Sequence, residues 1–302
     1  MRIGIDLGGT KIEAAVLDDS GEIICRRRVP TPQQSYQGTL TAISTLLHRL
    51  ELDCGLETAR LPVGIGTPGS LSPLTGRMKN CNSTCLNGQP LFDDLRRLLK
   101  RDVRIANDAD CFALSEALDG VASQQLNVFG VILGTGVGGG IVINKQLVSG
   151  PNGIAGEWGH NPLPPVPALF EGGDPVRRCY CGRSNCIETW LSGPSLEYSF
   201  SLYAKKRFNA AQIASAAVAG DAEAAKVMEH YYECLAAALA AVINVLDPDV
   251  IVLGGGLSNI QLLYEEVPKR WLRYVFNDYC ATRLLPAKFG DSSGVRGAAR
   301  LW

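Results

Sequence analysis

The chain has 302 residues, of which 46% are apolar and 20% are charged, and its formal net charge is −1. These values are ordinary for a globular protein with a sizeable core, and the length allows two domains or one large domain. Because nucleic-acid-binding domains usually carry a clustered surplus of basic residues, the charge balance argues against a nucleic-acid partner.

The chain also lacks the patterns of membrane and secreted proteins. No apolar run of about 18 residues or more occurs, so we expect no membrane span. The N-terminus enters a strand pattern at once, without a charged-then-apolar leader. Most of the ten cysteines are scattered without a framework spacing and are expected to be free thiols. A cytoplasmic location is the expectation.

A β-hairpin is predicted at the start of the chain. The apolar run at residues 3–7 breaks into a Gly-Gly-Thr turn, and a second apolar run follows at 12–17. Glycine-rich turns between two such runs are typical of hairpins. Hydrophobic spacing then predicts a helix at 39–50, a strand at 61–67, an amphipathic helix at 91–100, a strand at 103–106 and a helix at 109–118.

The same hairpin pattern returns in the middle of the chain, where the apolar residues 131–133 lead into the glycine-rich segment 134–140. Two similar hairpins indicate two related α/β halves with a cleft between them. The second half continues with an irregular Pro- and Gly-rich loop at 161–178, a long helix at 222–246 ended by Asp247-Pro248, a buried strand at 249–253, a helix near 261–275 and a tail helix at 294–302.

We therefore predict an α/β fold of two domains with a deep interdomain cleft. The first domain covers residues 1–118 and is joined by the C-terminal helix, residues 291–302. The second domain covers residues 119–290.

Three glycine-rich turns, each after a strand pattern, predict nucleotide binding. Glycines let backbone N–H groups approach phosphate oxygens, and Asp6 could hold Mg²⁺ through water. The P-loop pattern is absent, and one such turn alone would be weak evidence, because many hairpin turns look alike. The predicted nucleotide-binding residues are Gly4, Asp6, Gly8, Gly9, Thr10, Lys11, Gly134, Thr135, Gly136, Gly138, Gly254, Gly255 and Gly256.

Asn107 and Asp108 lie where a predicted strand gives way to a helix, a position at which α/β proteins place ligand-facing groups. A carboxylate there could accept the proton of a substrate hydroxyl that attacks a γ-phosphoryl group. Such general-base help is worth roughly 10²–10⁴-fold in rate. The alternative is that Asp108 only caps the helix. Beside three phosphate-binding turns, we favour the catalytic role.

A metal site is predicted from the spacing H-x18-C-x-C-x4-C, formed by His160, Cys179, Cys181 and Cys186. One imidazole and three thiolates complete a closed tetrahedral zinc site of the structural kind. Four unrelated residues, or a disulfide, would be the alternatives.

Two carboxylates, Glu157 and Glu188, flank this metal set. Carboxylates and a neutral imidazole are suitable partners for sugar hydroxyls, which both donate and accept hydrogen bonds. His160 could serve twice, with one ring nitrogen on zinc and the other donating to a hydroxyl. The alternative is that both glutamates only support the metal ligands or lie on the surface.

Taken together, these motifs resemble the ROK family of sugar kinases, within the actin-like ATPase superfamily. The resemblance covers essentially the whole chain and, as an ordered set, is highly specific. The matching segments are residues 6–11, 64–69, 107–109, 134–140, 156–160, 179–188 and 247–256.

The resemblance implies two actin-like, ribonuclease H-like domains and ATP-dependent phosphorylation of a hexose hydroxyl, usually at C6. It implies ATP, Mg²⁺ and a structural Zn²⁺ as cofactors, a homodimer, and Asp108 as the general base. The sugar-contact positions are Gly69, Asn82, Asn107, Asp108, Glu157, His160 and Glu188. Asn185 departs from the family pattern, which usually has Gly there. If the turn needs a left-handed backbone, Asn is the best substitute.

The loop at residues 80–90 is similar to that of bacterial fructokinases of the family, so fructose is the expected substrate. Mannose, glucose or N-acetylglucosamine are the alternatives on the same scaffold. A sugar-responsive repressor would need a DNA-binding segment, for which residues 1–5 leave no room. A sugar sensor without catalysis is disfavoured because Lys11, Asp108 and the glycine-rich turns are all present.

Overall fold

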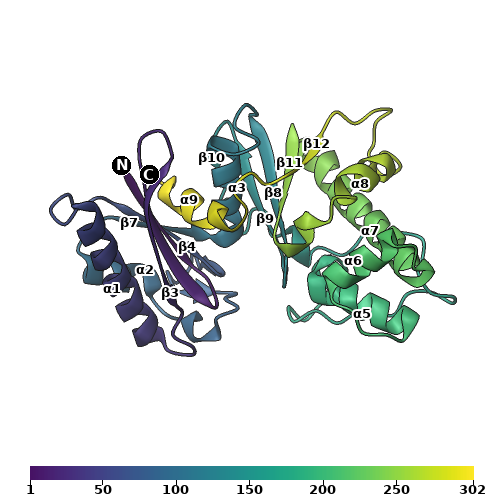
Figure 1. Ribbon diagram of the computed structural model, residues 1–302, viewed down its shortest axis with the longest axis horizontal. Coiled ribbons are helices and arrows are strands. Elements are labelled where there is room, and N and C mark those ends of the chain that lie inside the picture. The colour runs from purple at the N-terminus through teal and green to yellow at the C-terminus, as the bar shows by residue number, and fades with distance from the viewer. The chain divides into compact units, whose positions relative to one another are not determined.

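The computed structural model describes residues 1–302, apart from the side chain of Asp291, as strands alternating with helices (Figure 1). The chain forms two compact units. The first unit is Met1–Ser123, Gly140–Ala155 and Lys288–Trp302, and the second is Gln124–Gly139 and Gly156–Ala287. We describe each unit by itself, and the domain boundaries given above stay predictions.

A mixed sheet forms the centre of the first unit. Its strand order is β3 (Ile23–Pro30), β2 (Lys11–Leu17), β1 (Arg2–Leu7), β4 (Val63–Thr67) and β7 (Val103–Asn107). β1 and β2 pair antiparallel as the predicted hairpin, whereas β1, β4 and β7 run parallel. The carboxyl ends of these three parallel strands therefore meet at one edge of the sheet.

Helices cover this sheet, and a short hairpin completes the unit. α1 contacts β2 and β3, while α3 and α9 contact each other. α1 is longer than predicted because Ser35 caps its start and Gly55, in the left-handed region, ends it. The elements are α1 (Tyr36–Cys54), β5 (Ser70–Leu71), β6 (Met78–Lys79), η1 (Thr84–Leu86), α2 (Leu91–Leu99), α3 (Asp108–Leu118), η4 (Gly290–Ser292) and α9 (Ser293–Ala299).

Gly4, which we predicted to bind nucleotide, has a packing role. It is buried in β1, and a Cβ atom there would lie 2.1 Å from the carbonyl oxygen of Val295 in α9. Only glycine lets the helix approach the strand this closely. This packing accounts for the glycine, and a role of Gly4 in nucleotide binding stays a prediction.

The second sheet repeats the order of the first. Its strands are β10 (Gln146–Leu147), β9 (Val137–Ile143), β8 (Asn127–Leu133), β11 (Val250–Gly254) and β12 (Arg283–Pro286). β10 and β9 are antiparallel, and β11 is parallel to both β8 and β12. In each sheet the first three strands along the chain pair in sequence order. The fourth strand then pairs with the first strand on its other side, and the fifth pairs with the fourth. This shared order confirms the prediction of two related α/β halves.

The helices of the second unit gather around α7, whose bounds are those predicted. Asp221 caps its start, and Asp247 ends it in the left-handed region just before Pro248. The elements are η2 (Trp158–His160), α4 (Glu188–Leu191), α5 (Gly193–Ala204), α6 (Ala210–Val218), α7 (Ala222–Leu246), η3 (Gly256–Asn259) and α8 (Leu263–Trp271). Since α8 ends at Trp271, the helix predicted near 261–275 is too long.

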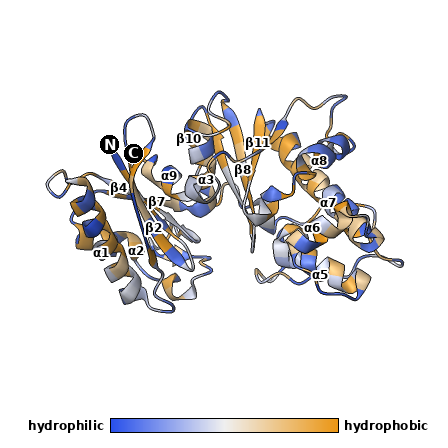
Figure 2. Cartoon of the chain, in the orientation of Figure 1, coloured by the Kyte–Doolittle hydropathy of each residue, from blue (hydrophilic) through white to orange (hydrophobic). Residues whose placement is uncertain are grey.

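Apolar residues fill the sheets and the inner faces of the helices, as the hydropathy colours show (Figure 2). The core of the first unit includes Ile3, Ile5, Ile43 and Ile65, each fully buried. Alternating hydrophobic positions in strands and three-or-four-residue steps in α1 bring these side chains together. Among the described residues, no helix is both long and apolar enough to cross a lipid bilayer.

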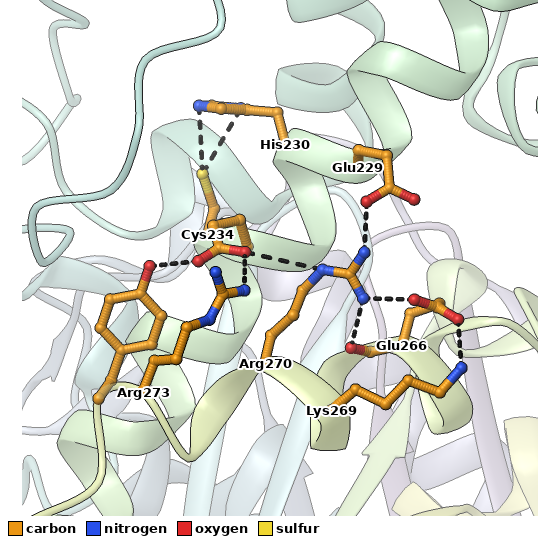
Figure 3. A network of polar contacts seen from close by, with 9 residues as sticks. Glu229, His230, Cys234, Glu266, Lys269, Arg270 and Arg273 are labelled. Atoms are coloured by element: carbon orange, nitrogen blue, oxygen red, sulfur yellow. Dashed lines mark hydrogen bonds and ion pairs between the residues drawn. The ribbon is translucent and has the colours of Figure 1, made fainter.

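Ion pairs join α7 to α8 along their polar sides (Figure 3). The guanidinium of Arg270 contacts the carboxylates of Glu229 and Glu266 and lies 3.6 Å from that of Glu233. Arg273 reaches the same Glu233 at 2.7 Å. Because the Arg270 side chain is only 14% exposed, this network is part of the helix–helix packing.

Candidate functional site

The first glycine turn joins β1 to β2 and is hydrogen-bonded to the segment that follows β3. The N–H of Gly8 donates to the carbonyl of Lys11 at 3.0 Å, which closes the turn. The hydroxyl of Thr31 donates to the Gly8 carbonyl, and the amide of Gln33 donates to that of Gly9. The carbonyls of Gly8 and Gly9 are thus hydrogen-bonded within the protein, and Gly9 and Thr10 are exposed.

Asp6 lies near the carboxyl end of β1 with its carboxylate enclosed by neighbouring glycines. A Cβ atom would lie 2.9 Å from this carboxylate at Gly294 and 3.7 Å from it at Gly66. Burial, and then the nearby charge of Asp108, raise the pKa of Asp6 from 3.8 to about 7. A bound cation would favour the ionised form, so the position suits the predicted Mg²⁺.

Asn107 and Asp108 stand at the carboxyl end of β7, at the same sheet edge as Asp6. Asn107 is the N-cap of α3, since its side chain accepts the N–H of Ala109 at 2.8 Å. Its amide nitrogen donates to the carbonyl of Gly69 at 3.3 Å. Asp108 is the first residue of α3 and is exposed. Its carboxylate therefore lies at the positive end of the helix dipole.

Asn82 lies beside the first glycine turn. It lines a pocket of about 330 Å³ together with Gly9, Thr10 and residues 83–86. The loop predicted to bind the sugar therefore borders the turn predicted to bind phosphate.

The second glycine turn, between β8 and β9, is bonded to the segment that carries Glu188. The carboxylate of Glu188 accepts the N–H of Val137 at 2.9 Å, and Gly193 donates to the carbonyl of Gly134 at 2.8 Å. A Cβ atom at Gly136 would lie 2.6 Å from the Glu188 carboxylate. Glycine is thus required where this carboxylate approaches the turn.

A larger pocket of about 930 Å³ lies in the second unit, against Gly134, Thr135 and Gly256. Gly255 has φ 82°, and a Cβ atom there would lie 2.4 Å from the carbonyl oxygen of Leu133. The third turn therefore packs closely on β8. The start of α5 and one side of α6 line the same pocket, and our sequence reasoning missed both. The signal for α5 was the sequence Ser192-Gly193-Pro194, in which an N-cap serine precedes a proline in the first turn of the helix.

The four predicted metal ligands come together. Their ligand atoms all lie within 4.8 Å of one another. Sγ of Cys179 is 3.5 Å from Nδ1 of His160, and the sulfurs of Cys181 and Cys186 are 3.6 Å apart. A tetrahedral zinc with ordinary bond lengths needs about 3.6 Å between nitrogen and sulfur and about 3.8 Å between sulfurs. The set therefore fits zinc, with His160 binding through Nδ1.

The Cys181 thiol and the backbone at Asn185 agree with this fit. Hydrogen bonds from Arg183, first from its backbone N–H, lower the pKa of the Cys181 thiol to about 6, which favours the thiolate that metals bind. Asn185 adopts φ 55°, so the turn has the left-handed backbone for which Asn is the best substitute for Gly, and its side chain accepts the N–H of Arg177 at 2.8 Å.

Two further residues surround the metal set, and our sequence reasoning missed them. Arg177 is buried, and the central carbon of its guanidinium lies 3.6 Å from the ring centroid of Trp190. The guanidinium also donates to the carbonyl of Thr189 at 2.8 Å, so Arg177 stabilises α4 through two of its residues. The hydroxyl of Tyr180 lies 3.0 Å from Nε2 of His160. A single sequence offers no signal for either, because both depend on contacts made across the loop.

The family model of the ROK family matches residues 2–302. The chain is 42% identical over 303 residues to an N-acetyl-D-glucosamine kinase of Yersinia pseudotuberculosis serotype IB (strain PB1/+), which covers 100% of this chain and 98% of the relative. It is 42% identical over 304 residues to one of Pasteurella multocida (strain Pm70), with 100% and 99% covered. These relatives are N-acetyl-D-glucosamine kinases, whereas we predicted a similarity to fructokinases.

Solved structures have the same fold. A ROK hexokinase from Thermus thermophilus superposes with a TM-score of 0.84 at 29% identity, covering 99% of this chain and 96% of that one. A ROK family glucokinase from Streptomyces griseus in complex with glucose and AMPPNP gives a TM-score of 0.76 at 27% identity, with 99% and 98% covered. The predicted actin-like α/β fold of this family is confirmed.

Proposed function

Since this chain belongs to the ROK family and is a sugar kinase, we propose that its substrate is N-acetyl-D-glucosamine, phosphorylated by ATP. The observation that carries the substrate is the 42% identity, over the full length, to kinases of that sugar. The observation that carries the chemistry is the exposed Asp108 beside Asp6 at the edge of the first sheet.

In the proposed complex, the glycine turns of the two halves hold the ATP phosphates through backbone N–H groups, and Thr10 and Lys11 add a hydroxyl and a charge. The pocket of about 930 Å³ that Gly134 and Gly256 line is large enough for the adenosine. When bound, Mg²⁺ would neutralise charge on the transferring phosphoryl group, and Asp6 is the group we propose to hold it. The cleft between the domains stays a prediction.

Asp108 acts as the general base. The sugar hydroxyl gives its proton to the Asp108 carboxylate as its oxygen attacks the γ-phosphorus, and the bond to the β-phosphate oxygen breaks to release ADP. Asn107 assists because its side chain caps α3 and so fixes the orientation of the Asp108 backbone. Both roles follow from the strand-to-helix junction of β7 and α3.

The predicted sugar contacts are Gly69, Asn82 and Asn107 in the first unit and Glu157, His160 and Glu188 in the second, and they stay predictions. We propose that His160, Cys179, Cys181 and Cys186 bind zinc, which fits their distances. The metal would fix the loop from which His160 and Glu188 project, since Glu188 follows Cys186 by two residues. It has no part in the phosphoryl transfer itself.

The test is a coupled ADP-release assay with Mg-ATP and a panel of N-acetylglucosamine, fructose, glucose and mannose. We expect the highest kcat/KM with N-acetylglucosamine. Asp108→Asn should lower kcat by roughly 10²–10⁴-fold. Asp93→Asn, an exposed aspartate of α2, is the matched control and should leave kcat unchanged.

Each other outcome has a definite meaning. Preference for fructose would overturn the substrate while keeping the mechanism. Full activity of Asp108→Asn would remove Asp108 as the base. Binding of a sugar without turnover in the wild-type protein would favour a sensor that does not catalyse.

A further inference from the structure

The hydroxyl of Tyr180 occupies a position that the proposed function reserves for the sugar. It lies 3.0 Å from Nε2 of His160, and the two rings meet edge to face at 5.1 Å between centroids. Nδ1 of the same imidazole faces the sulfur of Cys179. Nε2 is therefore the nitrogen left for a sugar hydroxyl, and Tyr180 already holds it.

Only one of the two partners can use this nitrogen well. An imidazole bound to metal through Nδ1 carries a single proton on Nε2, so it donates one good hydrogen bond. A sugar hydroxyl that accepts this proton has to replace the phenol oxygen. The phenol and the sugar thus compete for the same N–H group.

The side chain is free to leave this position. Tyr180 is 71% exposed, so little packing is lost when its ring turns. Its backbone lies between Cys179 and Cys181, two of the proposed metal ligands, so the main chain is held on both sides. Movement is then a rotation about the side-chain bonds, which for exposed residues is fast compared with turnover.

We propose that the Tyr180 hydroxyl takes the place of a sugar hydroxyl at His160 in the free protein and rotates away when the sugar binds, so that Tyr180 sets the affinity of the site for its sugar. The proposal rests on the proposed function, because it needs His160 to contact the sugar. It adds a residue that adjusts the affinity of this site for the sugar.

The test is Tyr180→Phe, which keeps the ring and removes the competing hydroxyl. Sugar binding is measured by isothermal titration calorimetry with N-acetylglucosamine in the absence of nucleotide, and KM and kcat are measured separately. We expect Kd and KM for the sugar to fall about threefold to tenfold, as expected when one competing hydrogen bond is lost, with kcat and KM for ATP unchanged. Tyr279→Phe, with a similarly exposed ring in the same unit, is the control and should change nothing.

A second readout does not depend on catalysis. Rotation of Tyr180 should give a tyrosine absorbance difference when sugar is added to the wild-type protein, and this difference should be absent from Tyr180→Phe. Zinc content should be equal in both proteins. An unchanged or higher Kd in Tyr180→Phe, or loss of its zinc, would overturn the proposal. Binding without turnover would instead overturn the kinase function alone, and absence of sugar binding in the wild type would overturn both.

Discussion

Replacing Asp6 by asparagine should remove catalysis and at the same time stabilise the fold. Asp6 is held in a place that disfavours its charge, since burial and then Asp108 raise its pKa from 3.8 to about 7. Each tenfold change in proton affinity corresponds to about 1.4 kcal/mol. The ionised carboxylate therefore lowers the free energy of unfolding by about 4 kcal/mol when no cation is bound.

The effect has a definite dependence on pH. Between the unfolded pKa of 3.8 and the folded pKa of about 7, the folded protein holds a proton that the unfolded chain has lost. Stability of the metal-free protein therefore falls as pH rises through this range. Asp6→Asn carries no charge, so its advantage over the wild type should be about 4 kcal/mol at pH 8 and about 1.5 kcal/mol at pH 5.

Urea denaturation at pH 5 and pH 8, without Mg²⁺, measures both values. Asp278→Asn, at an exposed position, is the control and should show no advantage at either pH. Adding Mg²⁺ at pH 8 should stabilise the wild type and leave Asp6→Asn unaffected. An advantage of equal size at both pH values would refute the reasoning, because it would mean that Asp6 titrates as an ordinary carboxyl group.

Three further predictions follow from single contacts. Gly136→Ala should raise KM for the sugar by about tenfold and leave kcat nearly unchanged, because its Cβ atom would displace the Glu188 carboxylate; an unchanged KM in steady-state assays would contradict this. Removing zinc with a chelator should loosen the loop, so that trypsin cuts faster after the exposed Arg178 and Arg183, and should lower activity; a zinc-free sample with full activity would refute it. Arg270→Met should lower the free energy of unfolding, measured by urea denaturation, by about 2–4 kcal/mol, because three carboxylates lose the cation that they share. A change below about 0.5 kcal/mol would contradict the role of this network in stability.

Local patterns in the sequence predict the elements well where one cause decides the structure. The bounds of α7 are correct because its hydrophobic steps are regular and because Asp221 and Pro248 mark its two ends. The two hairpins are correct because each glycine turn separates two apolar runs. α8 is too long in the prediction because the apolar spacing continues past Trp271, where the chain leaves the helix.

The sequence predicts the candidate site only in part. The metal ligands are identified by spacing, and their approach to within 4.8 Å confirms that they gather. Gly4 shows the limit, since a glycine that permits close packing of α9 looks the same in sequence as one that binds phosphate. Arg177 and Tyr180 act through partners that lie elsewhere in the loop, and no local pattern marks them.

Glu188 explains why the metal set and the second glycine turn occur together in one chain. Its carboxylate accepts the N–H of Val137 in that turn, and its backbone follows Cys186 by two residues. A shift of the loop would therefore move a proposed sugar contact and a proposed phosphate contact at once. Because one side chain bonds both regions, a metal that fixed the loop would also fix these two proposed contacts relative to each other, as a transfer between the substrates requires.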